Sequence, residues 1–368
     1  MRKEKDNMNA TGIQYLLDLN QRHSEEFLRQ EDERRNHRKR YSTEIAALKC
    51  MDGRVHLPVM TNIPLGVIQP YRNLGGRFYL GWSFFQRHIL NWRKYAAGVG
   101  RDCVVLVTYH YSKGDEHRGC KGHDYDKGRA MEYALELKRQ FDEDFQPGVP
   151  LGDHASVFYS FVVGIETDDD ALIWHSQNGN EVLDLSQVAP GSESELLERL
   201  YTLHPEIAVK TPTVLDHMLP LVKGNIEHIA EVKASNRTPL EMDHQESILG
   251  LGQGFGWLHL PKIALIVGPW EPTLSEPIRT AASLIEKNLK EGRLNGQDPV
   301  LITSAPYREN GPDPLLAARK SRYYRELALR VISREFPDLL ARLKVLCTTV
   351  DLRTMKLDVL DATTEPAR

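Results

Sequence analysis

The stretch EIAALKCMDGRVHLP, residues 44–58, joins an apolar strand pattern to a run of reactive side chains. Its first seven residues, EIAALKC, are typical of a buried β-strand. Cys50, Asp52 and Arg54 then alternate, and in a continuing strand all three would project to one face. A thiolate, a carboxylate and a guanidinium could therefore share one site. Taken alone, the pattern equally fits a structural Asp–Arg ion pair beside a buried cysteine.

Further strand patterns follow, with helical patterns between them. An apolar segment at 64–76 precedes a predicted helix over 78–98 and a predicted strand over 103–112. After a polar loop, a helix over 126–145 and a strand over 156–168 complete the series. This alternation of strands and helices predicts an α/β fold with a mainly parallel sheet.

Segment 12–40 is predicted to be helical, with Ile13, Leu16 and Leu17 at helical spacing near its start. The remainder is charged on nearly all sides. Its basic end, residues 34–40, follows several acidic residues, which is typical of a solvated helix face. A nucleic-acid-binding patch is the alternative interpretation.

The composition is that of a soluble two-domain protein. The chain has 368 residues, 47 Lys or Arg against 51 Asp or Glu, and a formal net charge of −4. This balance gives no overall field that would attract nucleic acid. No apolar run approaches the roughly 20 residues of a membrane span, and the N-terminus lacks the apolar region of a secretory signal. We therefore expect a cytoplasmic protein that binds neither nucleic acid nor membrane.

The second half resembles the first. LLDLNQRHSEE (16–26) aligns with LVKGNIEHIAE (221–231), VHLP (55–58) with LHLP (258–261), VLVT (105–108) with VLIT (300–303), and GIETDDDAL (164–172) with TVDLRTMKL (349–357). The four matches occur in the same order while the offset shrinks from 205 to 185 residues. We infer a tandem duplication with deletions in its loops.

The cysteines and histidines point to a metal. Four cysteines are too few for a disulfide framework, and Cys103 and Cys347 lie in apolar strands where a cysteine acts as a small buried hydrophobe. The loop HYSKGDEHRGCKGH, residues 110–123, follows the second strand and contains three histidines and Cys120. A catalytic zinc uses three Cys or His ligands, and ligands at the ends of parallel strands meet at one sheet edge. Cys50, one histidine and Cys120 would form such a set.

Two histidines compete for the third ligand position. His117 has the short H-x-x-C spacing to Cys120, whereas His110 ends a predicted strand, as Cys50 does. A rigid strand end holds a ligand better than a flexible loop, which favours His110. His117 and His123 would then be loop residues that hydrogen-bond nearby.

The segments CMDGRV, VTYHYSKGDEHRGCKGH, NIEHIAEV and ESILGLGQGFGWLHLPKIA together resemble the carboxysome shell carbonic anhydrase family, a divergent branch of the β-class carbonic anhydrases. The resemblance implies Cys50, His110 and Cys120 as Zn²⁺ ligands, with Asp52 and Arg54 as a catalytic pair. It also implies an α/β fold of tandem duplicated β-carbonic-anhydrase-like units with mainly parallel sheets, which form an intrachain pseudo-dimer.

The family fuses an active half to a degenerate half, and this chain fits that arrangement. Through the offset of 203 residues, Cys50, Asp52 and Arg54 correspond to Gln253, Phe255 and Trp257. We therefore predict an N-terminal helical arm (1–43), a zinc-binding catalytic domain (44–200) and a zinc-less domain (201–368). The family carries a long N-terminal region, whereas about 43 residues precede the catalytic half here, so the compartment, cytoplasm or carboxysome, is left open.

The expected activity is reversible hydration of CO2 to bicarbonate. Rival interpretations are a related hydrolase of CS2 or COS, and a non-catalytic protein that uses zinc only for folding, although a structural site would more often have four ligands. The expected partner is the small-molecule substrate. A homo-oligomer of pseudo-dimers, and association with a carboxysome shell or with Rubisco, are left open.

Overall fold

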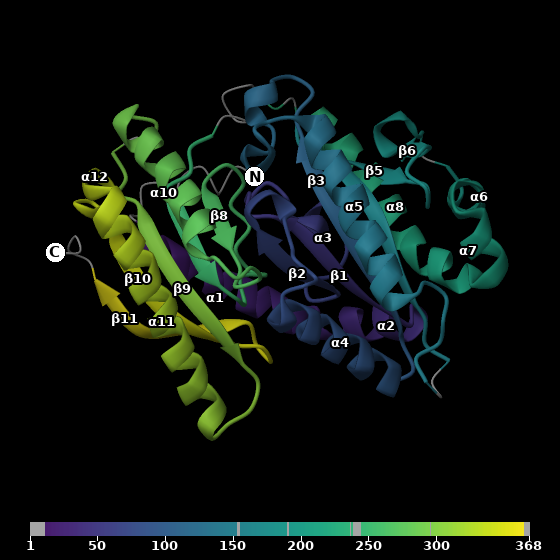
Figure 1. Cartoon of the computed structure of the whole chain (residues 1–368), viewed down its shortest axis with the longest axis horizontal. Coiled ribbons are helices and arrows are strands. Elements are labelled where there is room, and N and C mark those ends of the chain that lie inside the picture. Colours follow the sequence, from purple (N-terminus) through teal and green to yellow (C-terminus); the bar gives the residue numbers. More distant parts are fainter. Residues whose placement is uncertain are drawn as a thin grey trace. The chain divides into compact units, whose positions relative to one another are not determined.

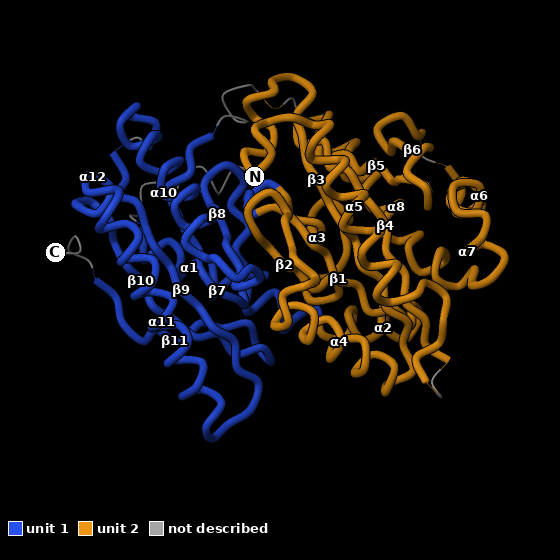
Figure 2. Tube along the Cα trace, viewed as in Figure 1, with its two compact units in different colours: residues 1–30, 51–54, 244–368 blue, residues 31–50, 55–243 orange. Residues whose placement is uncertain are grey.

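The computed structural model describes residues 12–152, 155–189, 191–235, 237, 244–294 and 296–363 (Figure 1). Its contacts divide the chain into two compact units, unit 1 and unit 2, each with one β-sheet (Figure 2). None of the described helices is both long enough and apolar enough to cross a membrane.

Unit 2, residues 31–50 and 55–243, contains a six-stranded sheet in the order β2-β1-β3-β4-β5-β6. The strands are β1 (Thr43–Cys50), β2 (Ile68–Asn73), β3 (Asp102–Tyr111), β4 (Phe158–Glu166), β5 (Ala171–His175) and β6 (Val182–Asp184). The first four strands in this order pair in parallel, and β5 and β6 are antiparallel additions at one edge. The predicted strands at 44–50, 103–112 and 156–168 are confirmed, as is the mainly parallel sheet.

Unit 2 also contains α-helices. They are α2 (Glu31–Arg40), α3 (Leu57–Met60), α4 (Ser83–Gly98), α5 (Lys127–Phe145), α6 (Glu193–Leu203), α7 (Pro205–Lys210) and α8 (Pro212–Ala234). α5 packs on β3 and β4 (Figure 1). Its Phe141 and Phe145 stack against Phe158 of β4. α8 packs on β5 and contributes to an aliphatic and aromatic core with Phe161 and Trp174. Burial of such side chains from water is the main contribution to the stability of the unit.

Unit 1 comprises residues 1–30, 51–54 and 244–368 and contains a five-stranded sheet in the order β11-β10-β9-β7-β8. Its elements are α1 (Ile13–Arg29), β7 (Ile248–Gly252), β8 (Ala264–Val267), α10 (Ser275–Lys290), β9 (Val300–Tyr307), α11 (Pro312–Glu335), α12 (Pro337–Leu340), β10 (Lys344–Asp351) and β11 (Lys356–Thr363). Only β11 pairs antiparallel. The order β8-β7-β9-β10-β11 has the same topology as β2-β1-β3-β4-β5, so the two units share one arrangement, as the predicted tandem duplication requires.

The predicted helical segment 12–40 divides between the units. α1 belongs to unit 1 and packs on β10 and β11, whereas α2 belongs to unit 2. In the same way α8, which precedes the second sheet in the sequence, packs on β5 of the first sheet. The helix that opens each repeat therefore packs on the sheet of the other repeat. The predicted domain borders after residues 43 and 200 divide the chain by its sequence repeat, whereas the compact units divide it by contacts. These borders therefore stay a prediction.

A buried asparagine joins each of these helices to a β-hairpin. In unit 2, Asn225 of α8 accepts a hydrogen bond from Leu172 N (2.9 Å) and donates to Asp170 O (2.8 Å). In unit 1, Asn20 of α1 accepts from Leu357 N (2.9 Å) and donates to Met355 O (2.9 Å). These are the residues that the sequence repeat aligned. Both hairpins also place the aligned turn residue in the left-handed region, Asp170 at φ 55° and Met355 at φ 58°.

We predict that Asn225→Ala lowers the free energy of unfolding by about 2–4 kcal/mol, because it leaves a buried N–H and two buried carbonyls, one of them Met60 O, without partners. Asn20→Ala should lower the free energy of unfolding by about 2–3 kcal/mol, because a buried N–H and a partly buried carbonyl lose their partner. Urea denaturation measures both values.

The matched control is Asn91→Ala, at an exposed position on α4, which should change stability by no more than about 0.5 kcal/mol. Equal stability of the Asn225→Ala and Asn91→Ala proteins would contradict the anchoring role of Asn225.

Candidate metal centre

Three potential metal ligands of unit 2 meet at one edge of its sheet. Cys50 is the last residue of β1, His110 lies next to the end of β3, and Cys120 lies in the loop that follows β3. β1 and β3 are parallel neighbours, so their carboxyl ends adjoin. The three ligand atoms all lie within 4.8 Å of one another. The residues are buried, with exposed fractions of 5%, 1% and 3%.

The residues fit a zinc ion. Two thiolates that bind zinc tetrahedrally at about 2.3 Å lie about 3.8 Å apart, and the Sγ atoms of Cys50 and Cys120 are 3.7 Å apart. Both ring nitrogens of His110 are buried without a hydrogen-bond partner among the described residues, which a metal at one of them would relieve. Two thiolates and one imidazole leave a fourth tetrahedral position open. This is the only such group of His, Cys, Asp and Glu side chains in the described part of the chain.

The other two histidines of the loop lie away from this group. The side chain of His117 is 87% exposed, and its Nδ1 is 3.3 Å from Asp115 Oδ1. His123 is buried and donates from Nε2 to Gly75 O (2.8 Å), as expected of a loop residue that hydrogen-bonds nearby. Burial lowers the pKa of His123, which keeps the ring neutral. The structure thus brings His110, and not His117, to the two cysteines.

The remaining cysteines behave as predicted. Cys103 and Cys347 lie in β3 and β10 and are fully buried. Burial raises the pKa of the Cys103 thiol to about 12, so it stays protonated and acts as a small hydrophobe.

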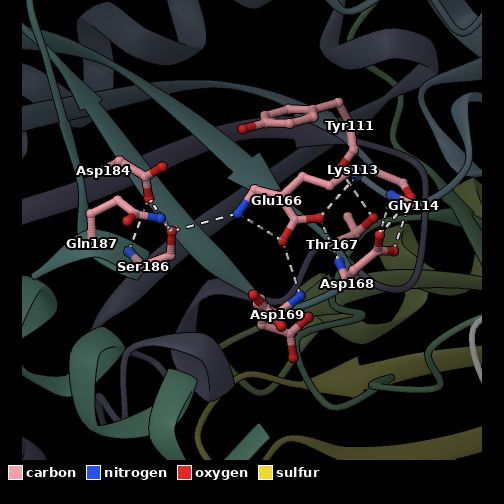
Figure 3. Close-up of polar contacts among 12 residues, drawn as sticks. Tyr111, Lys113, Gly114, Glu166, Thr167, Asp168, Asp169, Asp184, Ser186 and Gln187 are labelled. Atoms are coloured by element: carbon pink, nitrogen blue, oxygen red, sulfur yellow. Dashed lines mark hydrogen bonds and ion pairs between the residues drawn. The ribbon is translucent and has the colours of Figure 1, made fainter. Parts of the chain in front are cut away.

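Two carboxylates, one buried and one partly buried, hold the ligand loop, which we define as residues 111–119, between His110 and Cys120. They come from the acidic turn, residues 166–170, which connects β4 to β5 (Figure 3). Glu166 accepts hydrogen bonds from the backbone N–H of Lys113 (3.2 Å), and also from two N–H groups of its own turn. Because it has no contact with solvent, burial raises its pKa against the opposing effect of these donors.

Asp168 holds the same loop from the next turn position. Its carboxylate accepts from Ser112 Oγ (2.9 Å) and Gly114 N (2.7 Å), and lies 3.5 Å from the Arg118 guanidinium. A Cβ at residue 114 would lie 2.6 Å from that guanidinium, so glycine permits the close approach. The loop is thereby fixed at residues 112–114 and again at Arg118, just before Cys120.

A second contact fixes the far side of Cys120. Gly122 packs on the short turn Leu74–Gly76, where a Cβ at residue 122 would lie 2.4 Å from the Gly75 Cα. Gly75 has φ 65°, a left-handed conformation that favours glycine. Cys120 is therefore held between two anchored segments.

The structure corrects one part of the strand interpretation. β1 ends at Cys50, and residues 51–54 form a turn that belongs to unit 1, so alternation along a strand does not extend to Asp52 and Arg54. In this turn Gly53 N donates to Ala264 O (2.9 Å), and a Cβ at residue 53 would lie 2.5 Å from that oxygen. Glycine is required there by close packing.

Asp52 and Arg54 form a two-pronged ion pair. Arg54 Nη2 is 2.6 Å from Asp52 Oδ2, while Arg54 Nε and the Arg54 backbone N–H donate to Oδ1 at 3.1 and 2.8 Å. Both side chains are buried. Since only Met51 separates Asp52 from Cys50, the chain restricts their Cα atoms to at most about 7 Å apart.

The second repeat lacks the ligands. Among the counterparts of the site residues, Phe255 and Trp257 are buried in the hydrophobic core of unit 1, and Gln253 accepts a hydrogen bond from Lys320 (3.0 Å). In the turn that corresponds to the acidic turn, Asp351 pairs with Arg353 through Nη2 (2.7 Å) and the backbone N–H (2.9 Å). In unit 2 the carboxylates of this turn accept hydrogen bonds from the ligand loop, whereas in unit 1 the corresponding carboxylate, Asp351, pairs within its own turn.

Sequence reasoning missed Glu166 and Asp168. The signal was the acidic run ETDDD at the end of a predicted strand, which had contributed only to the repeat alignment. The acidic run reaches the ligand loop because β4 pairs with β3 as far as Glu166 opposite Tyr111. The sequence pattern did not specify this register.

We predict that Asp168→Ala accelerates hydrogen exchange at the Gly114 amide by about tenfold or more, because one charge-assisted hydrogen bond is lost. Exchange is followed by NMR or mass spectrometry, with amides of β4 as an internal reference. The matched control is Asp169→Ala, since the Asp169 side chain makes no bond among the described residues. Identical exchange at Gly114 in the two variants would disprove the anchoring role of Asp168.

Comparison with known proteins agrees with this geometry. No curated protein sequence matches the chain significantly. The family model described as the carboxysome shell carbonic anhydrase catalytic domain matches residues 49–210, a range that includes Cys50, His110 and Cys120. The resemblance noted from the sequence is therefore confirmed over this region. Residues 49–210 of the chain are thus similar to the catalytic domain of the carboxysome shell carbonic anhydrase family.

Proposed function

We propose that the chain is a carbonic anhydrase that interconverts CO2 and bicarbonate at a zinc ion held by Cys50, His110 and Cys120. The observation that carries this proposal is the buried Cys-His-Cys group inside the region that matches the catalytic-domain family. When bound, zinc would supply the Lewis acid that makes a water molecule nucleophilic near neutral pH. With three protein ligands, one position stays open for that water, as in catalytic zinc sites generally.

Asp52 and Arg54 are proposed to orient the reacting water. Asp52 is an acceptor within chain reach of Cys50, and Arg54 binds both of its carboxylate oxygens. A carboxylate held in this way can accept a hydrogen bond from water in one direction only. Because both oxygens are engaged, Asp52 is also restrained from becoming a fourth metal ligand.

His117 is a better candidate than His123 for transferring the proton released by CO2 hydration to solvent. Its exposed imidazole can exchange protons with solvent, and Asp115 contacts it. His123, in contrast, is buried and its Nε2–H is bound to Gly75 O.

The carboxysome is the compartment that the family match favours, and we propose it for this chain, together with a supporting role for the metal-less unit. The residues that replace the site in unit 1 are core residues, Phe255 and Trp257, which suits a scaffold. Co-purification with shell fractions against a free cytoplasmic pool tests the location.

We predict that Cys50→Ser, His110→Ala and Cys120→Ser each abolish stoichiometric zinc, because two ligands bind zinc far more weakly than three. Zinc per chain is measured by mass spectrometry of the metal after dialysis. The matched control is His117→Ala, which should retain full zinc because that side chain faces solvent. Full zinc content in the His110→Ala protein would overturn the ligand assignment.

Asp52→Asn and Arg54→Ala should keep zinc and lower the rate of CO2 hydration by about 100-fold, the effect of removing a positioned proton acceptor. The control is Asp351→Asn, which alters an Asp–Arg ion pair of the same geometry in the second repeat and should leave the rate unchanged. Loss of zinc from Asp52→Asn would mean that Asp52 is structural.

The substrate is tested by assays of CO2 hydration and CS2 hydrolysis on one zinc-loaded preparation. We expect CO2 hydration to dominate. Hydrolysis of CS2 without CO2 hydration would replace the proposal with the related hydrolase, and absence of both would favour a structural zinc.

Oxidation should also expel the metal. Peroxide takes two electrons from the Cys50 and Cys120 thiolates and two protons from solvent, which yields one disulfide and two waters. The 3.7 Å separation of the two sulfurs allows this with little movement of the chain. We predict loss of zinc together with two of the four thiols, and recovery after reduction and zinc addition. Unchanged metal content after peroxide would refute this.

A further inference from the structure

The outer face of α4 carries two exposed aromatic side chains. Phe84, Asn91 and Tyr95 follow one another at i, i+7 and i+11, a spacing that places them along one line of the helix. Phe84 and Tyr95 are 43% and 58% exposed, while Phe85 and Ile89 on the inner side are fully buried. We define the α4 face as residues 84, 87, 91, 94 and 95. Exposed aromatic side chains grouped in this way are typical of a surface that binds another molecule.

The α4 face is also cationic. Arg87 and Lys94 are seven residues apart and therefore flank the aromatic line on the same side. Both are exposed, and neither has an ion-pair or hydrogen-bond partner among the described residues. The carboxylate that does reach α4, Asp144, bonds to Gln86, which helical geometry places on the opposite side from Phe84.

The segment of the chain that contains α4 has no acidic residues. Residues 53–101 contain no Asp or Glu, although the chain has 51 such residues among 368. The exposed surface of α5 shows the ordinary alternative, since Arg139 there pairs with both Glu136 and Glu143. The cations of the α4 face are thus left for an external partner.

The chemistry favours a protein over a nucleic acid. A phosphate-binding surface needs a row of cations, whereas this face pairs two cations with an aromatic line and with the exposed Leu90 beside them. Aromatic and arginine side chains, surrounded by polar groups, are the residues that dominate protein–protein contacts. Complementary charge would come from carboxylates.

We propose that the α4 face is a docking surface for an acidic, amphipathic segment of another protein. Apolar side chains of that segment pack on Phe84 and Tyr95, and its carboxylates pair with Arg87 and Lys94. None of these residues belongs to the candidate metal centre, so the proposal stands independently of the catalytic one.

The test uses the full zinc-loaded chain and a fluorescein-labelled acidic amphipathic peptide, with Glu on its polar face and Leu and Phe on the other. Fluorescence anisotropy should show salt-sensitive binding. The double substitution Arg87→Glu with Lys94→Glu should weaken peptide binding by about tenfold or more. The double substitution Phe84→Ala with Tyr95→Ala should weaken binding by a similar factor, and this loss should depend less on the salt concentration.

The matched control is Arg319→Glu with Arg322→Glu on α11, which changes the net charge equally at two exposed arginines beside the exposed Tyr323. It should leave binding unchanged. Equal weakening by this control would reduce the effect to overall charge and overturn the proposal, as would absence of binding.

Two further outcomes would also overturn it. Tighter binding of a short DNA duplex than of the peptide would assign the face to nucleic acid. Sedimentation that shows a self-associated chain, dispersed by Arg87→Glu with Lys94→Glu, would assign it to a second copy of the chain. All four substituted side chains are exposed, so unaltered thermal unfolding is the expected check on folding.

Discussion

The parallel pairing of β1 with β3, and of β3 with β4, is the constraint on which the candidate metal centre depends. It places the end of β1, with Cys50, and the end of β3, with His110, at the same edge of one sheet. The register of β3 and β4 continues to Tyr111 and Glu166, which brings the acidic turn beside the ligand loop. A slip of one residue would displace these groups by about 3.3 Å, more than a zinc–ligand bond.

The two repeats show which parts of this arrangement belong to the fold and which to the site. Strand order, the hairpin, its left-handed turn residue and the asparagine anchor occur in both units. The ligands, the carboxylates that hold their loop and the ion pair at Asp52 occur in the first repeat only, and core side chains stand at the positions of Asp52 and Arg54 in the second repeat. The fold therefore does not require the metal-ligand candidates, because the second repeat forms the same strand order without them.

The ion pairs illustrate the same distinction. Asp351 and Arg353 adopt the same fork as Asp52 and Arg54, with an exposed arginine and without a group of metal-ligand candidates among the described residues of their repeat. Fork geometry alone is thus no sign of catalysis, because an Asp-x-Arg turn produces it locally. What sets Asp52 apart is its position two residues after a buried metal-ligand candidate.

Much of this could be predicted from local sequence. Residue patterns in the sequence predicted the apolar strands, the amphipathic helices and the repeat. They also predicted that Cys50 and Cys120 share one site. The choice of His110 over His117 also followed, because a strand end is a more rigid support than a loop.

Only the tertiary structure decided the rest, since it depends on contacts between segments distant in sequence. It showed that α1 and α8 pack on the sheet of the other repeat, that Asp52 lies beyond the end of β1 in a turn, and that Glu166 and Asp168 hold the ligand loop. A carboxylate at a strand end looks the same in sequence whether it faces solvent or accepts backbone N–H groups. The sequence by itself determined which side chains were available for a metal, and the register between strands decided which of them meet.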